Sequence, residues 1–164
     1  MNEAYAVGIE YRIATVGDFQ QLADLRWRLH VDDEPLCDAD VYDRFVVEFM
    51  DVLKAEWKTN EIAHWIAVEG DHVLAVMSVV IVRKMPKPSN LRARWGYLCN
   101  SYVLPEVRNA GVGGRLLAVV KNWAAAENLE LLVVWPSELA YPFYERAGFS
   151  RQVDPLVLKF APPS

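Results

Sequence analysis

Arg108-Asn109-Ala110-Gly111-Val112-Gly113-Gly114 joins an apolar, extended run at Tyr97–Leu104 to a helical pattern at Gly113–Glu127. A strand that turns through glycines into a helix is an anion site. The first N–H groups of a helix lack internal partners, and the helix dipole adds partial positive charge. The glycines carry no Cβ, so a phosphate can approach the main chain, and the leading arginine can add donors. The stretch therefore predicts a pyrophosphate site.

The type of phosphate site follows from what this loop lacks. No Lys-Ser/Thr pair follows the glycines, as it does in loops that hold a nucleoside triphosphate and magnesium. The pattern is not Gly-x-Gly-x-x-Gly, and it lies far from the N-terminus rather than in a first βαβ unit. A diphosphate without bound metal fits better. The alternative is that these glycines only make a tight turn between strand and helix.

Two flanking motifs carry a family resemblance. Val103–Leu117 resembles the acetyl-CoA signature of the GCN5-related N-acetyltransferase (GNAT) family, Arg/Gln-x-x-Gly-x-Gly/Ala, with Val-x-Pro before it and Leu-Leu after it. Ser137–Phe149 resembles the second signature of that family and ends in Tyr-Glu-x-x-Gly-Phe. The motifs have the expected order and spacing. The resemblance extends over Ile9–Phe160 and is specific over Tyr97–Phe149.

The alternation of helical and extended patterns predicts an α/β fold. The resemblance implies a mixed, mostly antiparallel central sheet flanked by helices, with splayed central strands at Tyr97–Leu104 and Leu131–Trp135. Further strands are expected at Ile9–Ala14, His64–Glu69, Val73–Val82, Gln152–Val153 and Leu156–Phe160. Helices are expected after Thr15, at Val41–Trp57, at Gly113–Glu127 and at Leu139–Ala147, with loops at Val31–Asp40 and Lys84–Arg94.

Composition limits the class of protein. A chain of 164 residues with 53% hydrophobic content predicts a single domain over residues 1–164, which the resemblance implies is an acetyltransferase domain. The net charge of −5 and the lack of a basic run argue against a nucleic-acid partner. No apolar run is long enough for a membrane span, and no signal peptide is visible, so we expect a cytoplasmic protein without a membrane partner.

The cysteines and histidines predict no metal and no disulfide framework. Cys37 and Cys99 are too few for a framework and are expected to be free thiols in a reducing cytoplasm. His30, His64 and His72 show no ligand spacing.

The resemblance implies a binding site for acetyl-CoA as cosubstrate. A bulge in the first splayed strand would turn main-chain groups near Tyr102 and Val103 toward the pantetheine arm. Ser137 occupies a slot where many members carry an Asn that bonds this arm, although it could instead cap the helix near Leu139. The expected pyrophosphate ligands are the N–H groups of Arg108, Asn109, Ala110, Gly111, Val112, Gly113 and Gly114.

Tyr144 is the expected catalytic acid. Acetyl transfer releases the CoA thiolate, and a free thiol has a pKa of about 8.5, so a nearby phenol can protonate it. The resemblance assigns this role to the tyrosine of Tyr-Glu-x-x-Gly-Phe. The alternative is a half-buried core tyrosine on an amphipathic helix.

The general base and the acceptor pocket are less well marked. Many members place a Glu on the central strand, where this chain has Asn100 and Ser101. Asp33 and Glu34 follow the first helix, where the family builds its acceptor pocket, and they could bind a cationic amine. Glu34 is the preferred base, acting through water, although a solvated acidic loop is the alternative. Trp27 and Asn100 are further acceptor candidates, although indoles more often fill cores.

The expected function is acetyl-CoA-dependent transfer to a primary amine, with a small cationic molecule as acceptor. Direct transfer in a ternary complex is expected, because no Cys or Ser nucleophile stands beside a His in sequence, and Cys99 is the covalent alternative. Other readings are an inactive acyl-CoA-binding sensor or interaction module, and a binder of another nucleotide diphosphate. Homodimers are common in the family, so a homodimer is possible.

Overall fold

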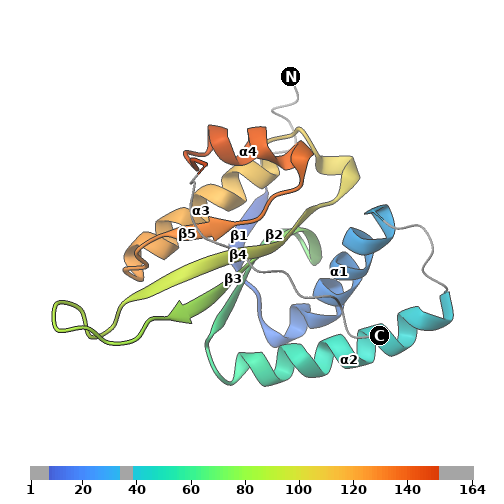
Figure 1. Ribbon diagram of the computed structural model, residues 1–164. Coiled ribbons are helices and arrows are strands. Elements are labelled where there is room, and N and C mark those ends of the chain that lie inside the picture. Colours follow the sequence, from blue (N-terminus) through green and yellow to red (C-terminus); the bar gives the residue numbers. More distant parts are fainter. Residues whose placement is uncertain (1–7, 34–38, 152–164) are drawn as a thin grey trace.

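The computed structural model describes residues 8–33 and 39–151 (Figure 1). Its five-stranded sheet has the order β1-β2-β3-β4-β5. The strands are β1 (Ile9–Ile13), β2 (Ile62–Glu69), β3 (His72–Arg83), β4 (Arg94–Val103) and β5 (Leu132–Val134). The helices are α1 (Phe19–Asp33), α2 (Ala39–Trp57), α3 (Val112–Ala126) and α4 (Tyr141–Arg146). Short 3-10 turns lie at Val16–Asp18, Pro105–Val107 and Glu138–Ala140.

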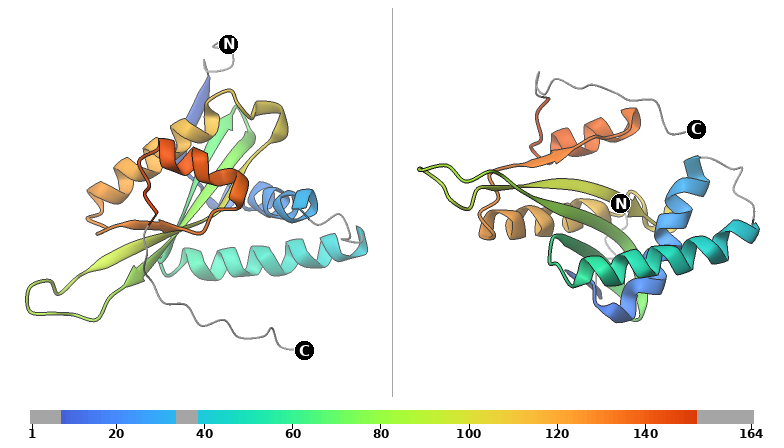
Figure 2. Two further views of the ribbon diagram at one scale, coloured as in Figure 1. Left: turned by 45° about the horizontal axis from the view of Figure 1, so that its top comes forward. Right: turned by 60° about the horizontal axis from the view of Figure 1, so that its bottom comes forward.

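The sheet is mostly antiparallel, as expected. The pairs β1–β2, β2–β3 and β3–β4 are antiparallel, and β4–β5 is parallel. Helices α1 and α2 lie together on one side of the sheet, and α3 and α4 lie on the other (Figures 1 and 2). The loop between β3 and β4 reaches beyond the body of the molecule (Figure 2).

Alternation along the strands divides the interior into two cores. In β2, Ile66 packs with the α1 and α2 side chains, whereas Ala67 faces the α3 side. In β3, Val76 and Met77 divide in the same way. Successive side chains of a strand point to opposite faces, so a central strand covered on both faces is apolar throughout. This explains why the run at Val73–Val82 is continuous rather than alternating.

Strand β4 contains an irregularity at its centre. Tyr102 pairs with Val76 and Cys99 pairs with Ser78, so the two intervening residues of β4, Asn100 and Ser101, lie opposite a single residue of β3. Asn100 has φ +48°, a left-handed conformation that asparagine tolerates better than most residues. This is a β-bulge, which bends the strand and re-aims its groups.

The two splayed strands separate just before this bulge. Strand β5 pairs with β4 only at Gly96, Tyr97 and Leu98. A Cβ on Gly96 would lie 2.6 Å from Leu132 Cδ2 and 2.8 Å from Val79 Cγ1, so glycine permits the close approach there. Beyond Leu98, β4 continues to Val103 without β5 beside it.

Polar side chains hold the short turn at Val16–Asp18 that leads into α1. Arg12 donates two hydrogen bonds to Asp18, at 2.8 and 2.9 Å, and Thr15 completes a capping box with the same carboxylate. Asp18 is only 7% exposed. The pKa of Asp18 is lowered to about 2, mainly by the hydrogen bonds from Arg12.

Some boundaries differ from expectation. Helix α1 continues to Asp33, into the expected loop at Val31–Asp40, because Val31–Asp33 contain no glycine or proline that would end it. Helix α3 begins at Val112 rather than Gly113, because Gly111 takes the N-cap position. The expected strands at Gln152–Val153 and Leu156–Phe160 lie outside the described residues. In the described part of the chain, no helix combines the length and apolar character needed to cross a membrane.

Candidate functional site

The turn before α3 has the backbone of an anion site. Asn109 has φ +63° and Gly111 has φ +83°, and alternating left- and right-handed residues aim successive N–H groups toward one point. The first bond of the helical ladder runs from Arg115 N–H to the Gly111 carbonyl oxygen at 3.0 Å. The N–H groups of the residues between them, Val112, Gly113 and Gly114, therefore precede the ladder and point out of the helix start.

Arg108 ties this turn to the end of β4. Its Nε donates to the Val103 carbonyl oxygen at 2.9 Å, and its guanidinium lies 5.3 Å from the centroid of the Tyr102 ring. A Cβ on Gly113 would lie 3.2 Å from Val103 Cγ2, so the start of α3 also approaches the strand closely. The structure thus brings together the residues expected at the pantetheine arm and at the pyrophosphate.

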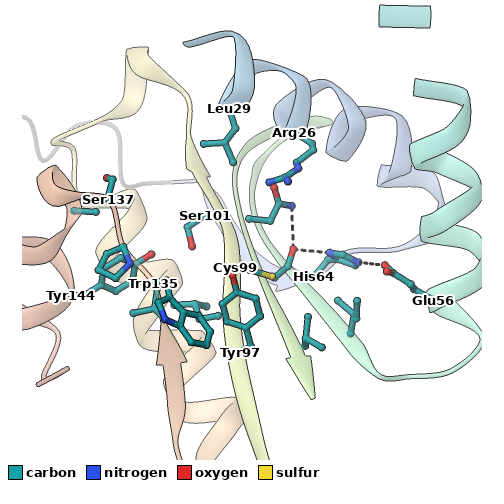
Figure 3. A pocket seen from close by; sticks show the side chains of 18 of the residues that line it. Arg26, Leu29, Glu56, His64, Tyr97, Cys99, Ser101, Trp135, Ser137 and Tyr144 are labelled. Carbon is teal, nitrogen blue, oxygen red and sulfur yellow. Dashed lines mark hydrogen bonds and ion pairs between the residues drawn. The ribbon is translucent and has the colours of Figure 1, made fainter. Parts of the chain in front are cut away.

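A cavity of about 540 Å³ opens where β4 and β5 separate (Figure 3). One wall comes from Trp135, Ser137 and Tyr144, and the floor comes from β4. The opposite wall comes from α1, α2 and the side chains of β2 and β3. Cavities of this size suit small molecules.

Tyr144 contributes its hydroxyl to this cavity and its ring to the core. It is 5% exposed, and its ring contacts those of Phe143 and Phe149 edge-on, at 5.0 and 5.5 Å between centroids. Burial raises the pKa of the phenol, and the Ser101 side chain partly opposes this. The phenol therefore keeps its proton near neutral pH and can donate it. The core and catalytic readings of this tyrosine are compatible.

A polar chain crosses the opposite wall (Figure 3). His64 Nδ1 lies 2.7 Å from Ser78 Oγ, and His64 Nε2 lies 3.9 Å from Glu56 Oε2. The side-chain amide of Asn100 donates to the same Ser78 Oγ at 3.2 Å. The Ser78 hydroxyl is then free to donate to Nδ1, which leaves the Nε2–H of His64 facing the Glu56 carboxylate.

Burial shifts the acid–base properties of this chain. Desolvation lowers the pKa of His64 to about 4, so its ring is neutral near pH 7. Desolvation also raises the pKa of Glu56. A carboxylate with a raised pKa is a better proton acceptor, and Glu56 faces the cavity.

Strand pairing brings a histidine nearer to Cys99 than the sequence shows. Cys99 pairs with Ser78, and Ser78 pairs with His64. However, the His64 ring is directed at Ser78 and Glu56, and burial raises the pKa of the Cys99 thiol. A thiol that keeps its proton is a weak nucleophile.

Comparison with known proteins identifies the family. The family model for the acetyltransferase (GNAT) family matches residues 19–149. The chain belongs to the GNAT family. Its sheet, its splayed strands and its glycine turn are those of a GNAT fold, which confirms the fold expected from the sequence. No curated protein matches the chain significantly.

Solved GNAT structures resemble the chain over nearly its whole length. A predicted acetyltransferase from Clostridium acetobutylicum, crystallised with acetyl-CoA, is 25% identical, with a TM-score of 0.75 over 92% of this chain and 96% of that one. A GCN5-related N-acetyltransferase from Ralstonia eutropha is also 25% identical, with a TM-score of 0.73 over 93% and 99%. Glucosamine-6-phosphate N-acetyltransferase from Arabidopsis thaliana shares the fold at 15% identity, with a TM-score of 0.67 over 93% and 99%.

The expected acceptor residues of this GNAT protein are only partly brought together. Asn100 lines the cavity, whereas Trp27 packs between α1 and α2 against Tyr42 and Phe45, with centroids 5.3 and 5.5 Å away, and is not part of the lining. Asp33 ends α1, and its side chain is outside the description. Glu34 lies outside the described residues.

Ser137 and the candidate metal ligands are the remaining residues of the site to be placed. Ser137 occupies the N-cap of the turn at Glu138–Ala140, but its side chain makes no capping bond and lines the cavity instead. Over residues 8–33 and 39–151, no group of three or more His, Cys, Asp or Glu side chains gathers as a metal site.

The sequence analysis missed the side chains of the opposite wall. Arg26, Glu56, His64 and Ser78 come from four different elements, and none belongs to a motif. The strand register pairs His64 with Ser78, and the approach of α2 to β2 brings Glu56 to His64. Glu56 lies near the end of α2, where no local pattern distinguishes it from the other acidic residues of that helix.

Proposed function

We propose that this GNAT protein transfers the acetyl group of acetyl-CoA to a primary amine. The observation that carries the proposal is the gap between β4 and β5. The turn before α3, which has the backbone conformation of anion sites, lies beside this gap. The gap continues into the cavity of about 540 Å³, which is lined by the buried phenol of Tyr144 with its raised pKa. A cosubstrate with a diphosphate at one end and a thioester at the other fits this order of features.

The cofactor side consists mainly of main-chain groups. The N–H groups from Arg108 to Gly114 would hold the pyrophosphate, as in other helix-start anion sites. The bulge at Asn100 and Ser101 turns the later part of β4 toward the gap, where Tyr102 and Val103 would hold the pantetheine arm through their peptide groups. Such fixed dipoles position a thioester without the cost of reorganisation.

Direct attack by the amine is the proposed route of transfer. The amine nitrogen forms a bond to the thioester carbonyl carbon, the C–S bond breaks, and Tyr144 protonates the departing thiolate. The raised pKa of the Cys99 thiol argues against an acetyl-cysteine intermediate.

Glu56 is the proposed proton acceptor. A protonated amine has a pKa near 10 and must lose a proton before it attacks. Glu56 is a carboxylate with a raised pKa on the cavity wall, and the chain through His64 and Ser78 links it to Asn100 on β4. It takes the role that the sequence analysis gave to Glu34.

An amine panel tests the proposal. Purified protein is incubated with acetyl-CoA and a broad set of small primary amines, and free thiol release is followed together with acetylated product. Amine-dependent release with matching product supports transfer. Protein that binds acetyl-CoA but releases no thiol with any amine contradicts the proposal and favours the sensor, which the absence of a carboxylate at Asn100 and Ser101 would then explain.

A further inference from the structure

Arg26 is a cation in the cavity wall without an obvious role. It is partly buried, it extends from α1 toward the middle of the cavity, and it lies near the bulge of β4 (Figure 3). Within the described residues, it makes no hydrogen bond, ion pair or ring contact. A guanidinium is a permanent cation, and partial burial removes some of its hydration, which a hydrogen-bonding partner would replace.

Among the described residues, the lining also includes one carboxylate, and it is not paired with Arg26. Glu56 comes from α2, and its Oε2 lies 3.9 Å from Nε2 of His64, whose ring is neutral near pH 7. Arg26 and Glu56 form no ion pair with each other. Both act on the thiol of Cys99, since Arg26 lowers its pKa and Glu56 raises it, so Cys99 lies within electrostatic reach of both. The cavity therefore has a positive group, Arg26, and a negative group, Glu56, and both lie within electrostatic reach of Cys99 on its floor.

We propose that the acceptor carries an anionic group beside its amine, and that Arg26 binds this anionic group. The inference rests on the proposed function, whose acceptor it makes more specific: a zwitterion rather than a simple cation. The planar guanidinium matches a carboxylate or a phosphate with two parallel hydrogen bonds. The ammonium end of the same molecule is favoured on the Glu56 side.

The phosphates of CoA are the competing partner for Arg26. None of the turn residues from Arg108 to Gly114 lines this cavity, whereas Arg26 shares it with Glu56, His64 and Ser78 on the acceptor side. Arg26 therefore belongs to the wall that the acceptor would contact, and the experiment must distinguish the two roles.

Three amines that share a two-carbon frame show whether the site prefers no anionic group, a carboxylate or a phosphate. Ethanolamine has no anionic group, serine adds a carboxylate, and O-phosphoethanolamine adds a phosphate. Phenylalanine and 2-phenylethylamine form a second, larger pair. We expect kcat/KM to be ~10-fold or more higher for the anion-bearing members, since a charge-assisted hydrogen-bonded pair has at least that effect. The serine and phosphate arms decide between carboxylate and phosphate.

Variants of Arg26 assign the effect to this side chain. Arg26→Gln is expected to raise KM for the anion-bearing amine ~10-fold or more, and to leave KM for ethanolamine and for acetyl-CoA unchanged. Arg26→Lys should retain part of the preference. Arg28→Gln is the matched control, because Arg28 is an exposed arginine of the same helix outside the cavity lining.

The outcomes separate this inference from the proposed function. Equal use of ethanolamine and its anionic relatives by the wild-type protein overturns the inference and leaves acetyl transfer intact. A rise in the KM for acetyl-CoA in Arg26→Gln assigns the residue to the cofactor instead. Thermal stabilisation by each amine in the presence of CoA gives a readout that needs no turnover. Absence of any Arg26-dependent stabilisation by the anionic amines also overturns the inference.

Discussion

Tyr144 is the residue in which packing and chemistry meet. Its ring belongs to the core on the α3 side, and its hydroxyl reaches the cavity. The family signature pointed to it in the sequence, and the structure adds that its hydroxyl lines the cavity and that burial keeps the phenol protonated.

We predict that Tyr144→Phe lowers kcat ~100-fold, because the thiolate then leaves without a proton donor. The dissociation constant for acetyl-CoA should stay within about twofold of the wild-type value, since the ring remains. A tenfold change would need a loss of ~1.4 kcal/mol of binding free energy. Steady-state kinetics and calorimetric binding measure the two quantities. Tyr141→Phe is the control, as Tyr141 lies on the same helix outside the cavity lining, under Arg151. Unchanged turnover in Tyr144→Phe would exclude the acid role.

Individual residues also mark the limit of what the sequence could predict. Tyr144 and the glycines of the turn were predictable because a local motif carries them. Glu56 and His64 were not, because their relation depends on the end of α2 meeting β2. The packing of Trp27 on Tyr42 was not predictable either, since an indole on an amphipathic helix gives no sign of which neighbour it contacts.

The start of α3 shows what a secondary-structure element adds to its residues. The glycine pattern predicted the helix and placed its start one residue late, at Gly113, whereas the N-cap at Gly111 and the close approach of Gly113 to Val103 appear only in the structure. The bulge at Asn100 was implied by the family and could not be derived from the residues, because its position depends on the register between β3 and β4.

The two open glycines of this helix start should behave differently. Gly111→Ala places a Cβ on a residue with φ +83°, which costs roughly 1–2 kcal/mol, and should also weaken CoA binding by distorting the turn. Gly114→Ala meets open space at an ordinary φ and should leave stability unchanged or raise it by up to ~1 kcal/mol. Urea unfolding measures stability, and CoA titration measures affinity. Equal stability of the two variants would mean that the left-handed cap is not needed.

For the molecule as a whole, we predict that the free energy of unfolding falls in two steps as the solution is acidified. His64 has a pKa of about 4 against an ordinary 6.5, so its share of stability is complete above pH 6.5 and is lost as the pH falls toward 4. Asp18 has a pKa of about 2 against an ordinary 3.8, so its share is complete above pH 3.8 and is lost toward pH 2. The full step is about 3 kcal/mol for His64 and about 2 kcal/mol for Asp18.

Urea unfolding between pH 7.5 and pH 2.5 checks both steps. His64→Gln should flatten the first step and keep the second, and Asp18→Asn should do the reverse, so each variant is the control for the other. A wild-type free energy of unfolding that stays constant between pH 6.5 and pH 4.5 would contradict the burial of a neutral His64.

The short pairing of β4 with β5 has a consequence for how such proteins diversify. Beyond Leu98, β4 has no β5 residue paired with it, and the proposed contacts to the cosubstrate use main-chain atoms. A point mutation exchanges a side chain and leaves the peptide unit in place. If the proposed function holds, substitutions in α1 and α2, which line the other wall of the cavity, would change the choice of amine and leave the main-chain contacts to the cosubstrate in place.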